Sequence, residues 1–290
     1  MIRKREIETL AEEKGVAKST IDKDWVLGHF LDAIFSIPEC RKSLIFKGGT
    51  CLKKCYFPDY RFSEDLDFTS VNLDFVLDKK LLARIMKLVT ERTNVPLHVH
   101  ELKPLKHKDT LTGYAALIKF WGADHTKNQA PPAPDRWTTS IKIEIILYET
   151  LLFPIVQKHV SHAYSDTLSD ATQSIPCYAI SEVLSEKLRA LIQRSYTAPR
   201  DFYDIWYLTN NVQDLDWVGI AEAFHKKMAF KGLEFTGIDQ MINADNDRSL
   251  KAAWNNSLAH QIAKDQLPEY EKVRAYLMEL LEKIVNTKHI

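Results

Sequence analysis

An alternation of acidic and apolar residues at 65–68, Asp-Leu-Asp-Phe, restricts this part of the chain to one kind of secondary structure. Period-two alternation is typical of a half-buried β-strand, in which Leu66 and Phe68 face the core. Asp65 and Asp67 then share the opposite face, about 7 Å apart. The pattern therefore predicts a strand with one wet, acidic face.

Two carboxylates at this spacing repel each other and take up protons unless a cation compensates their charge. Mg²⁺ prefers oxygen ligands and often completes its coordination shell with substrate phosphates. Two such ions, about 4 Å apart, can activate an attacking oxygen and stabilise the departing one in an in-line phosphoryl displacement. Asp65 and Asp67 are therefore the predicted metal ligands.

A Gly-Gly pair precedes the acidic strand and follows the apolar run 44–46. This order predicts a short strand that ends in a tight turn at Gly48 and Gly49, where backbone can approach a phosphate. A helix is expected to begin near Thr50, and its N-terminal amides favour an anion. A Gly-Gly pair alone is usually a turn, and an isolated Asp-x-Asp is usually a solvated strand face. Their combination in one short segment is a much stronger signal.

Residues 138–149 form a second alternating segment, with apolar residues at every other position and Lys142 and Glu144 between them. The alternation predicts a strand. An ordinary exposed face explains such a Lys-x-Glu pair when it stands alone, but beside an Asp-x-Asp strand Glu144 becomes the candidate third carboxylate. Arg61 and Ser63, just before the acidic strand, either contact phosphate or stabilise the loop.

Helical periodicity dominates both ends of the chain, and short strand candidates lie between them. The expected helices cover 4–36, 75–93, 181–194, a segment beginning at Pro199, 216–229, 248–263 and 268–286, and further strands are expected near 95–102 and 112–121. Residues 122–137 and 161–176 are expected to be loops. The pattern predicts a sheet-containing first part and a helical second part.

Composition narrows the class of protein. With 290 residues and 45% hydrophobic content, the chain can bury a core for one large or two modest domains. Its 39 Lys and Arg balance 39 Asp and Glu, so no net field draws it to nucleic acid or membrane. The charged N-terminus lacks an apolar signal region, and no run approaches the roughly 18 apolar residues that span a bilayer. We therefore expect a cytoplasmic protein without a membrane partner.

The four cysteines are Cys40, Cys51, Cys55 and Cys177, and they form no Cys-x-x-Cys motif. Cys51 and Cys55 share a helix face at i, i+4, but no pair of His or Cys residues follows at zinc-finger spacing. The sequence therefore favours reduced structural thiols.

A DNA-binding alternative arises from residues 9–24, which resemble a helix-turn-helix around Gly15. In this alternative the protein is a non-catalytic regulator with a degenerate acidic site. The competing explanation is a capped helical pair, with Ser19 or Thr20 as the N-cap. Neither the segment nor the whole chain is strongly basic, which disfavours DNA recognition.

Four segments occur in order: FKGGTCL, RFSEDLDF, IKIEI and EKLRALIQRSYTAPRDFYDIWYL. Together they span 46–208 and resemble the bacterial AbiEii-type nucleotidyltransferases, a branch of the DNA polymerase beta-like superfamily that includes toxins of type IV toxin–antitoxin systems. The resemblance implies an α+β fold. It consists of a mixed-sheet nucleotidyltransferase core with flanking helices over 1–178, followed by a helical C-terminal domain over 179–290.

The resemblance also implies a set of site residues, grouped by role. They are Gly48, Gly49 and Thr50 for the triphosphate, Asp65, Asp67 and Glu144 for the metal ions, Lys187 for the nucleotide phosphates, and Asp204 at a downstream acidic position. The family commonly has Asp at the third metal position, so Glu144 is a departure from its pattern.

The implied activity is Mg²⁺-dependent transfer of a nucleoside monophosphate from an NTP to an acceptor hydroxyl, with release of pyrophosphate. The resemblance points to RNA as acceptor, at the 3′ end of tRNA, and to a toxin whose cognate antitoxin acts indirectly. A small-molecule acceptor, as in antibiotic nucleotidyltransferases, is the alternative within the same enzyme class. The chain has no Walker A loop, Gly-x-Gly-x-x-Gly, His-Glu-x-x-His or Gly-x-Ser-x-Gly motif, which disfavours the corresponding classes of enzyme.

Overall fold

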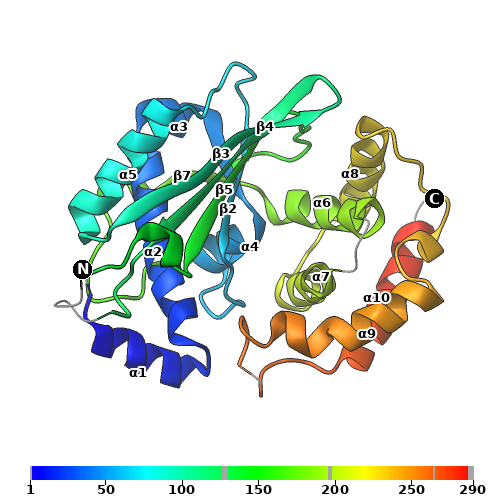
Figure 1. The fold of residues 1–290 in the computed structure, drawn as a ribbon. Coiled ribbons are helices and arrows are strands. Elements are labelled where there is room, and N and C mark those ends of the chain that lie inside the picture. The colour runs from blue at the N-terminus through cyan, green and yellow to red at the C-terminus, as the bar shows by residue number, and fades with distance from the viewer. Residues whose placement is uncertain (1, 126–129, 195–197, 264, 287–290) are drawn as a thin grey trace. The chain divides into compact units, whose positions relative to one another are not determined.

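The computed structural model describes residues 2–125, 130–194, 198–263 and 265–286 (Figure 1). The chain divides into two compact units. The first contains Met1–Glu149 and Ile155–Cys177, and the second contains Thr150–Pro154 and Tyr178–Ile290. The first unit holds a sheet with helices and the second is helical, which confirms the predicted α+β class. Within the described ranges, no helix has the length and apolar character needed to cross a membrane.

A seven-stranded mixed sheet forms the centre of the first unit, in the order β3-β4-β5-β2-β1-β7-β6. β2 pairs antiparallel with β1 and parallel with β5, and β1 pairs parallel with β7. The strands are β1 (Leu44–Lys47), β2 (Asp65–Ser70), β3 (Leu97–His107), β4 (Thr110–Phe120), β5 (Ser140–Ile146), β6 (Val156–Lys158) and β7 (Ile175–Cys177).

The helices of the first unit include two long ones, α2 and α5, which lie along the same face of the sheet (Figure 1). The α-helices are α1 (Lys4–Lys14), α2 (Lys18–Ser36), α3 (Pro38–Ser43), α4 (Gly48–Cys51) and α5 (Lys79–Thr93); η1 (Leu52–Tyr56) is a π-helix, and η2 (Pro134–Arg136) and η3 (Asp170–Thr172) are 3₁₀ turns. Phe68 of β2 packs against Phe35 of α2, with ring centroids 6.0 Å apart. The apolar side of β2 therefore faces α2, and its acidic side faces away.

The helix α2 lies within the core, which argues against the DNA-binding alternative. Its residues from Asp24 to Phe35 are all buried, whereas a recognition helix must expose a face to enter a groove. The helix begins at Lys18 after Ala17, so Ser19 and Thr20 lie in its first turn and neither is the N-cap. The helical pair is thus part of the scaffold of the first unit.

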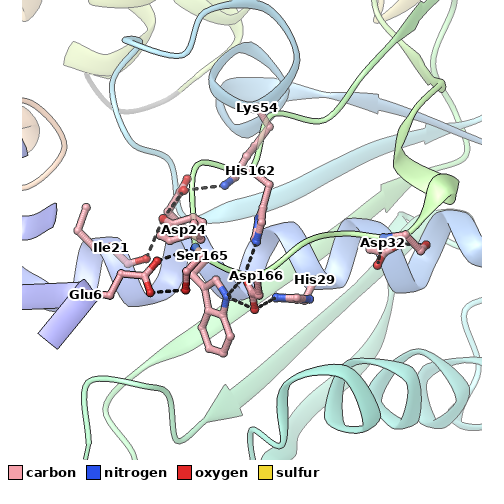
Figure 2. Close-up of polar contacts among 12 residues, drawn as sticks. Glu6, Ile21, Asp24, His29, Asp32, Lys54, His162, Ser165 and Asp166 are labelled. Atoms are coloured by element: carbon pink, nitrogen blue, oxygen red, sulfur yellow. Dashed lines mark hydrogen bonds and ion pairs between the residues drawn. The ribbon is translucent and has the colours of Figure 1, made fainter. Parts of the chain in front are cut away.

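Polar contacts fasten residues 162–169 to α2 (Figure 2). The carboxylate of Asp166 accepts a hydrogen bond from the Trp25 indole at 3.0 Å and contacts ring nitrogens of His29 and His162 at 3.1 and 2.9 Å. Burial opposes ionisation of this carboxyl, but the hydrogen bonds from the two histidines and the indole outweigh it and hold the pKa of Asp166 well below its usual range. Sequence patterning predicted only a loop here.

The buried carboxylate of Asp22, on α2, makes stability depend on pH. It accepts a hydrogen bond from the Ala123 amide at 2.8 Å, and burial raises its pKa from 3.8 to about 6. Between about pH 4 and 6 the folded state therefore binds a proton that the unfolded state has released, so stability falls as pH rises through this window. A shift of about two pKa units corresponds to about 3 kcal/mol.

The variant Asp22→Asn should therefore gain stability relative to wild type as pH rises. At pH 4 both side chains are neutral in the folded state, so the difference in unfolding free energy measured by urea denaturation reflects mainly the substitution. By pH 8 that difference should move in favour of the variant by up to about 3 kcal/mol. A pH-independent difference would show that Asp22 ionises normally in the fold.

Five α-helices make up most of the described part of the second unit. They are α6 (Ile180–Gln193), α7 (Pro199–Asn211), α8 (Trp217–Phe230), α9 (Ala244–Leu258) and α10 (Tyr270–Asn286), with a 3₁₀ turn η4 (Ile238–Gln240) before α9. Pro199 stands at the start of α7, where a missing amide costs no hydrogen bond. These helices agree with the sequence prediction to within a few residues at most ends.

A buried ion pair holds α6 and α8 together within the second unit. The ammonium of Lys227, on α8, lies 2.5 Å from a carboxylate oxygen of Glu182 and donates to the Thr150 carbonyl at 2.8 Å. The other Glu182 oxygen accepts hydrogen bonds from the backbone amides of Leu152 and Phe153 at 2.9 and 2.8 Å. This network joins residues 150–154 to the helices.

Some elements differ from the sequence prediction. The strands β6 and β7 are three residues each and the helix α3 has six, too short for periodicity to show. Residues 161–176, expected as a loop, contain a 3₁₀ turn and the beginning of β7. Part of the loop expected at 122–137 lies outside the described residues.

Candidate active site

Strand register brings the three predicted carboxylates onto one face of the sheet. Asp65 and Asp67 are the first and third residues of β2, and Asp67 pairs directly with Glu144 on the parallel strand β5. Paired residues on neighbouring strands project to the same side, so all three carboxylates lie on the face that α2 does not cover. All three side chains are half-buried.

Two lysines flank the carboxylates on the same face. Lys47, the last residue of β1, pairs in register with Asp67, and Lys142 of β5 pairs with Asp65. The Lys142 ammonium forms an ion pair with Glu144. Sequence reasoning missed both lysines as site residues, although the period-two alternation places Lys142 beside Glu144.

The electrostatic environment of Asp67 favours a bound cation. Burial and the Asp65 carboxylate raise the pKa of Asp67 from 3.8 to about 6. Glu144 adds to the rise, whereas Lys47 and Lys142 oppose it. Burial and the neighbouring carboxylates together disfavour the ionised form of Asp67, and carboxylate oxygens are the ligands that Mg²⁺ prefers. The donor set on this face fits a divalent metal ion.

The carboxylates share a face without converging on one point. Among the described residues, the His, Cys and carboxylate groups of three or more whose ligand atoms all lie within 4.8 Å of one another are Cys51–Cys55–Cys177 and His29–His162–Asp166. The trio of Asp65, Asp67 and Glu144 is not one of them. The ion pair between Glu144 and Lys142 holds the Glu144 side chain along β5.

The Gly-Gly turn lies against the acidic strand. Gly48 has a φ of +81°, which favours glycine, and a β-carbon there would lie 2.4 Å from an Asp67 carboxylate oxygen. The Thr50 hydroxyl donates to the Asp65 carbonyl at 2.5 Å. The helix begins at Gly48, two residues before the expected position, and continues as the π-helix η1.

Arg61 and Ser63 lie against the second glycine of the turn. A β-carbon at Gly49 would lie 2.9 Å from the Ser63 hydroxyl and 3.0 Å from the Arg61 guanidinium. The guanidinium is buried and donates to the Phe62 carbonyl at 3.2 Å. Both side chains therefore pack on the turn, which is the loop-stabilising role considered for them.

The remaining predicted residues lie in the second unit and contact each other. The Lys187 ammonium of α6 lies 3.0 Å from Asp201 and 2.5 Å from Asp204, both on α7. Asp204 is fully buried and Asp201 nearly so. Asp201 also pairs with Arg194 at 3.1 Å. Sequence reasoning named Lys187 and Asp204 as site residues but not Asp201, which shares the same cation.

A mixed sheet carries an Asp-x-Asp strand beside a Gly-Gly turn, with a third carboxylate on the next strand, and this is the arrangement expected of a nucleotidyltransferase. This chain belongs to the AbiEii family, described as nucleotidyl transferase AbiEii toxin of type IV toxin–antitoxin systems, whose model matches residues 29–278. The resemblance predicted from sequence is thereby confirmed, and so is the enzyme class.

Two solved structures share the fold at low sequence identity. MenT4, a nucleotidyltransferase toxin from Mycobacterium tuberculosis, is 15% identical and aligns over 99% of this chain and 98% of its own, with a TM-score of 0.57. JHP933 from Helicobacter pylori is 14% identical and aligns over 93% of each chain, with a TM-score of 0.53. No match was found among curated proteins.

Proposed function

We propose that this nucleotidyltransferase moves a nucleoside monophosphate from an NTP to an RNA hydroxyl, at the 3′ end of tRNA, in a Mg²⁺-dependent reaction. The observation that supports phosphoryl transfer best is the row of carboxylates on β2 and β5 beside the Gly48 turn. The RNA acceptor rests on the family resemblance, since a toxin that modifies tRNA would block translation. Such a substrate agrees with a cytoplasmic location and with a cognate antitoxin that acts indirectly.

In this proposal the carboxylates of Asp65, Asp67 and Glu144 hold the metal. Mg²⁺ bound there supplies Lewis-acid stabilisation of the charge on the phosphates. The backbone at Gly48 and Gly49 approaches the triphosphate, as the family resemblance implies, and glycine at both positions lets the turn pack closely against Asp67, Arg61 and Ser63. The acceptor oxygen displaces pyrophosphate directly, and no covalent enzyme intermediate forms.

Lys187 and Asp204 have different proposed roles in the same reaction. The Lys187 ammonium is proposed to offset negative charge as pyrophosphate leaves. Asp204, buried beneath it, holds the ammonium in place together with Asp201. Asp204 is therefore a positioning residue for the lysine.

The test is transfer of label from each of the four α-labelled NTPs into total RNA with Mg²⁺. Label in the tRNA band with wild type, and none with Asp65→Asn, would support the proposal. The control is Asp59→Asn, which changes an exposed carboxylate that pairs only weakly with Lys14 at 3.4 Å.

Two outcomes would redirect the proposal. Label that enters small molecules and leaves RNA unlabelled would favour the antibiotic-type alternative. Equal labelling of tRNA by wild type and Asp65→Asn would remove Asp65 from the site.

A further inference from the structure

Three of the four cysteines meet in the first unit, although they are far apart in sequence. Cys51 ends α4, Cys55 lies in the π-helix η1, and Cys177 ends β7. Their sulfur atoms all lie within 4.8 Å of one another. Sequence spacing showed only the pair Cys51 and Cys55, because the third thiol arrives through the parallel pairing of β7 with β1.

The separation of the sulfurs matches a thiolate metal site. In tetrahedral coordination with Zn–S bonds of about 2.3 Å, the sulfurs lie about 3.8 Å apart. The three thiols therefore need to close by no more than about 1 Å. Cys51 and Cys177 are buried and Cys55 is partly exposed, so Cys55 lies on the more exposed side of the cluster.

The local backbone is built to present these thiols. The π-helix η1 closes with a hydrogen bond of 2.9 Å from the Phe57 amide to the Leu52 carbonyl. This wider turn is rare and is frequently found at functional sites.

The other three-member cluster, His29–His162–Asp166, carries no comparable inference. Both oxygens of Asp166 already accept hydrogen bonds from the two imidazoles and from the Trp25 indole. A metal ion would have to break these bonds, whereas the cysteine sulfurs contact one another. Thiolates are also the softer ligands, which favours a thiophilic metal.

We propose that Cys51, Cys55 and Cys177 form a Zn²⁺ site, with water as the fourth ligand. Each thiol gives up its proton as it binds the metal. The site joins the helix that follows the Gly48 turn to strand β7, so the metal cross-links two segments that sequence separates by more than a hundred residues. Zn²⁺ bound at this site stabilises the fold of the first unit. This proposal is independent of which acceptor the nucleotidyl transfer uses.

The first experiment measures metal in the full chain, purified without a histidine tag and without chelators. We expect about one zinc per chain by mass spectrometry of the metal content. Stripped protein titrated with Co²⁺ should show thiolate-to-metal charge-transfer absorption and the visible bands of tetrahedral cobalt. Zn²⁺ should displace the cobalt and raise the melting temperature.

Two cysteine variants make the test specific. Cys55→Ser changes the partly exposed ligand and should weaken Co²⁺ binding by at least the 10- to 100-fold typical of losing an outer-shell partner. Cys40→Ser is the matched control, because Cys40 is a buried thiol on α3 outside the cluster. It should keep wild-type stoichiometry and spectra.

Three results would overturn the proposal. The first is wild-type protein that takes up no stoichiometric Zn²⁺ or Co²⁺ while its thiols remain reduced. The second is a Cys55→Ser variant that binds Co²⁺ as tightly as wild type. The third is a disulfide within the cluster in protein purified without reductant. The last result would identify a redox pair in place of a metal site.

Discussion

Replacing Asp67 by Asn should reduce nucleotidyl transfer at least about 1,000-fold while leaving the protein folded. The substitution removes one proposed metal-binding oxygen from the centre of the carboxylate row, where Asp67 lies between Lys47 and Glu144. Metal-dependent stabilisation of transferred phosphates contributes several kcal/mol, and a loss of about 4 kcal/mol corresponds to three powers of ten in rate. The measurement is initial rate of label transfer at saturating Mg²⁺.

The melting temperature of Asp67→Asn distinguishes a loss of activity from a loss of folding. Since burial and Asp65 raise the pKa of Asp67 to about 6, its ionised form is a cost to the folded state above that pH. At pH 8 and without metal, Asp67→Asn should therefore melt no lower than wild type. Asp59→Asn serves as the control for both measurements and should match wild type. A variant that keeps more than a tenth of the wild-type rate would contradict the assignment.

Replacing Lys227 by Met should destabilise the second unit by about 3 to 5 kcal/mol. Lys227 and Glu182 are both at most 1% exposed, and removing the ammonium leaves a buried carboxylate with only two amide donors. The Thr150 carbonyl also loses its donor. Urea denaturation followed by circular dichroism measures the change, because this unit is predominantly helical.

The neighbouring lysine provides the matched control. Lys226 is exposed and makes only a loose pair with Glu222 at 3.7 Å, so Lys226→Met should change stability by less than about 0.5 kcal/mol. The double variant Lys227→Met/Glu182→Gln should recover part of the loss, since it removes the unpaired charge. Equal effects of the two single lysine variants would mean that the buried pair is not formed.

Element type was predictable wherever a pattern lies within one element. The alternation at 65–68 and the helical stripes of the second half agree with β2, α6 and α8. Each depends on which face of a strand or helix is buried, and that preference is written in residues two to four positions apart. The strands β6 and β7 escaped prediction because three residues cannot display a period.

The helix-turn-helix alternative shows why a local pattern can mislead. Residues 9–24 do form two helices around a left-handed Gly15, as the pattern indicates. Burial of α2 from Asp24 to Phe35 comes from packing against α5 and the sheet, which are distant in sequence. The same local structure thus becomes scaffold through its tertiary partners.

The order of four motifs was sufficient to indicate the family and, through that resemblance, the α+β class. Short-range periodicity indicated an acidic strand beside a Gly-Gly turn, because that pattern depends on residues close in sequence. Only the tertiary structure decided strand register and long-range contacts. Register placed Lys47 and Glu144 on either side of Asp67, and the pairing of β7 with β1 brought Cys177 to Cys51 and Cys55. These contacts depend on pairing between distant segments. The alternation within each strand shows which of its faces is buried, but it does not determine which distant strand pairs with it.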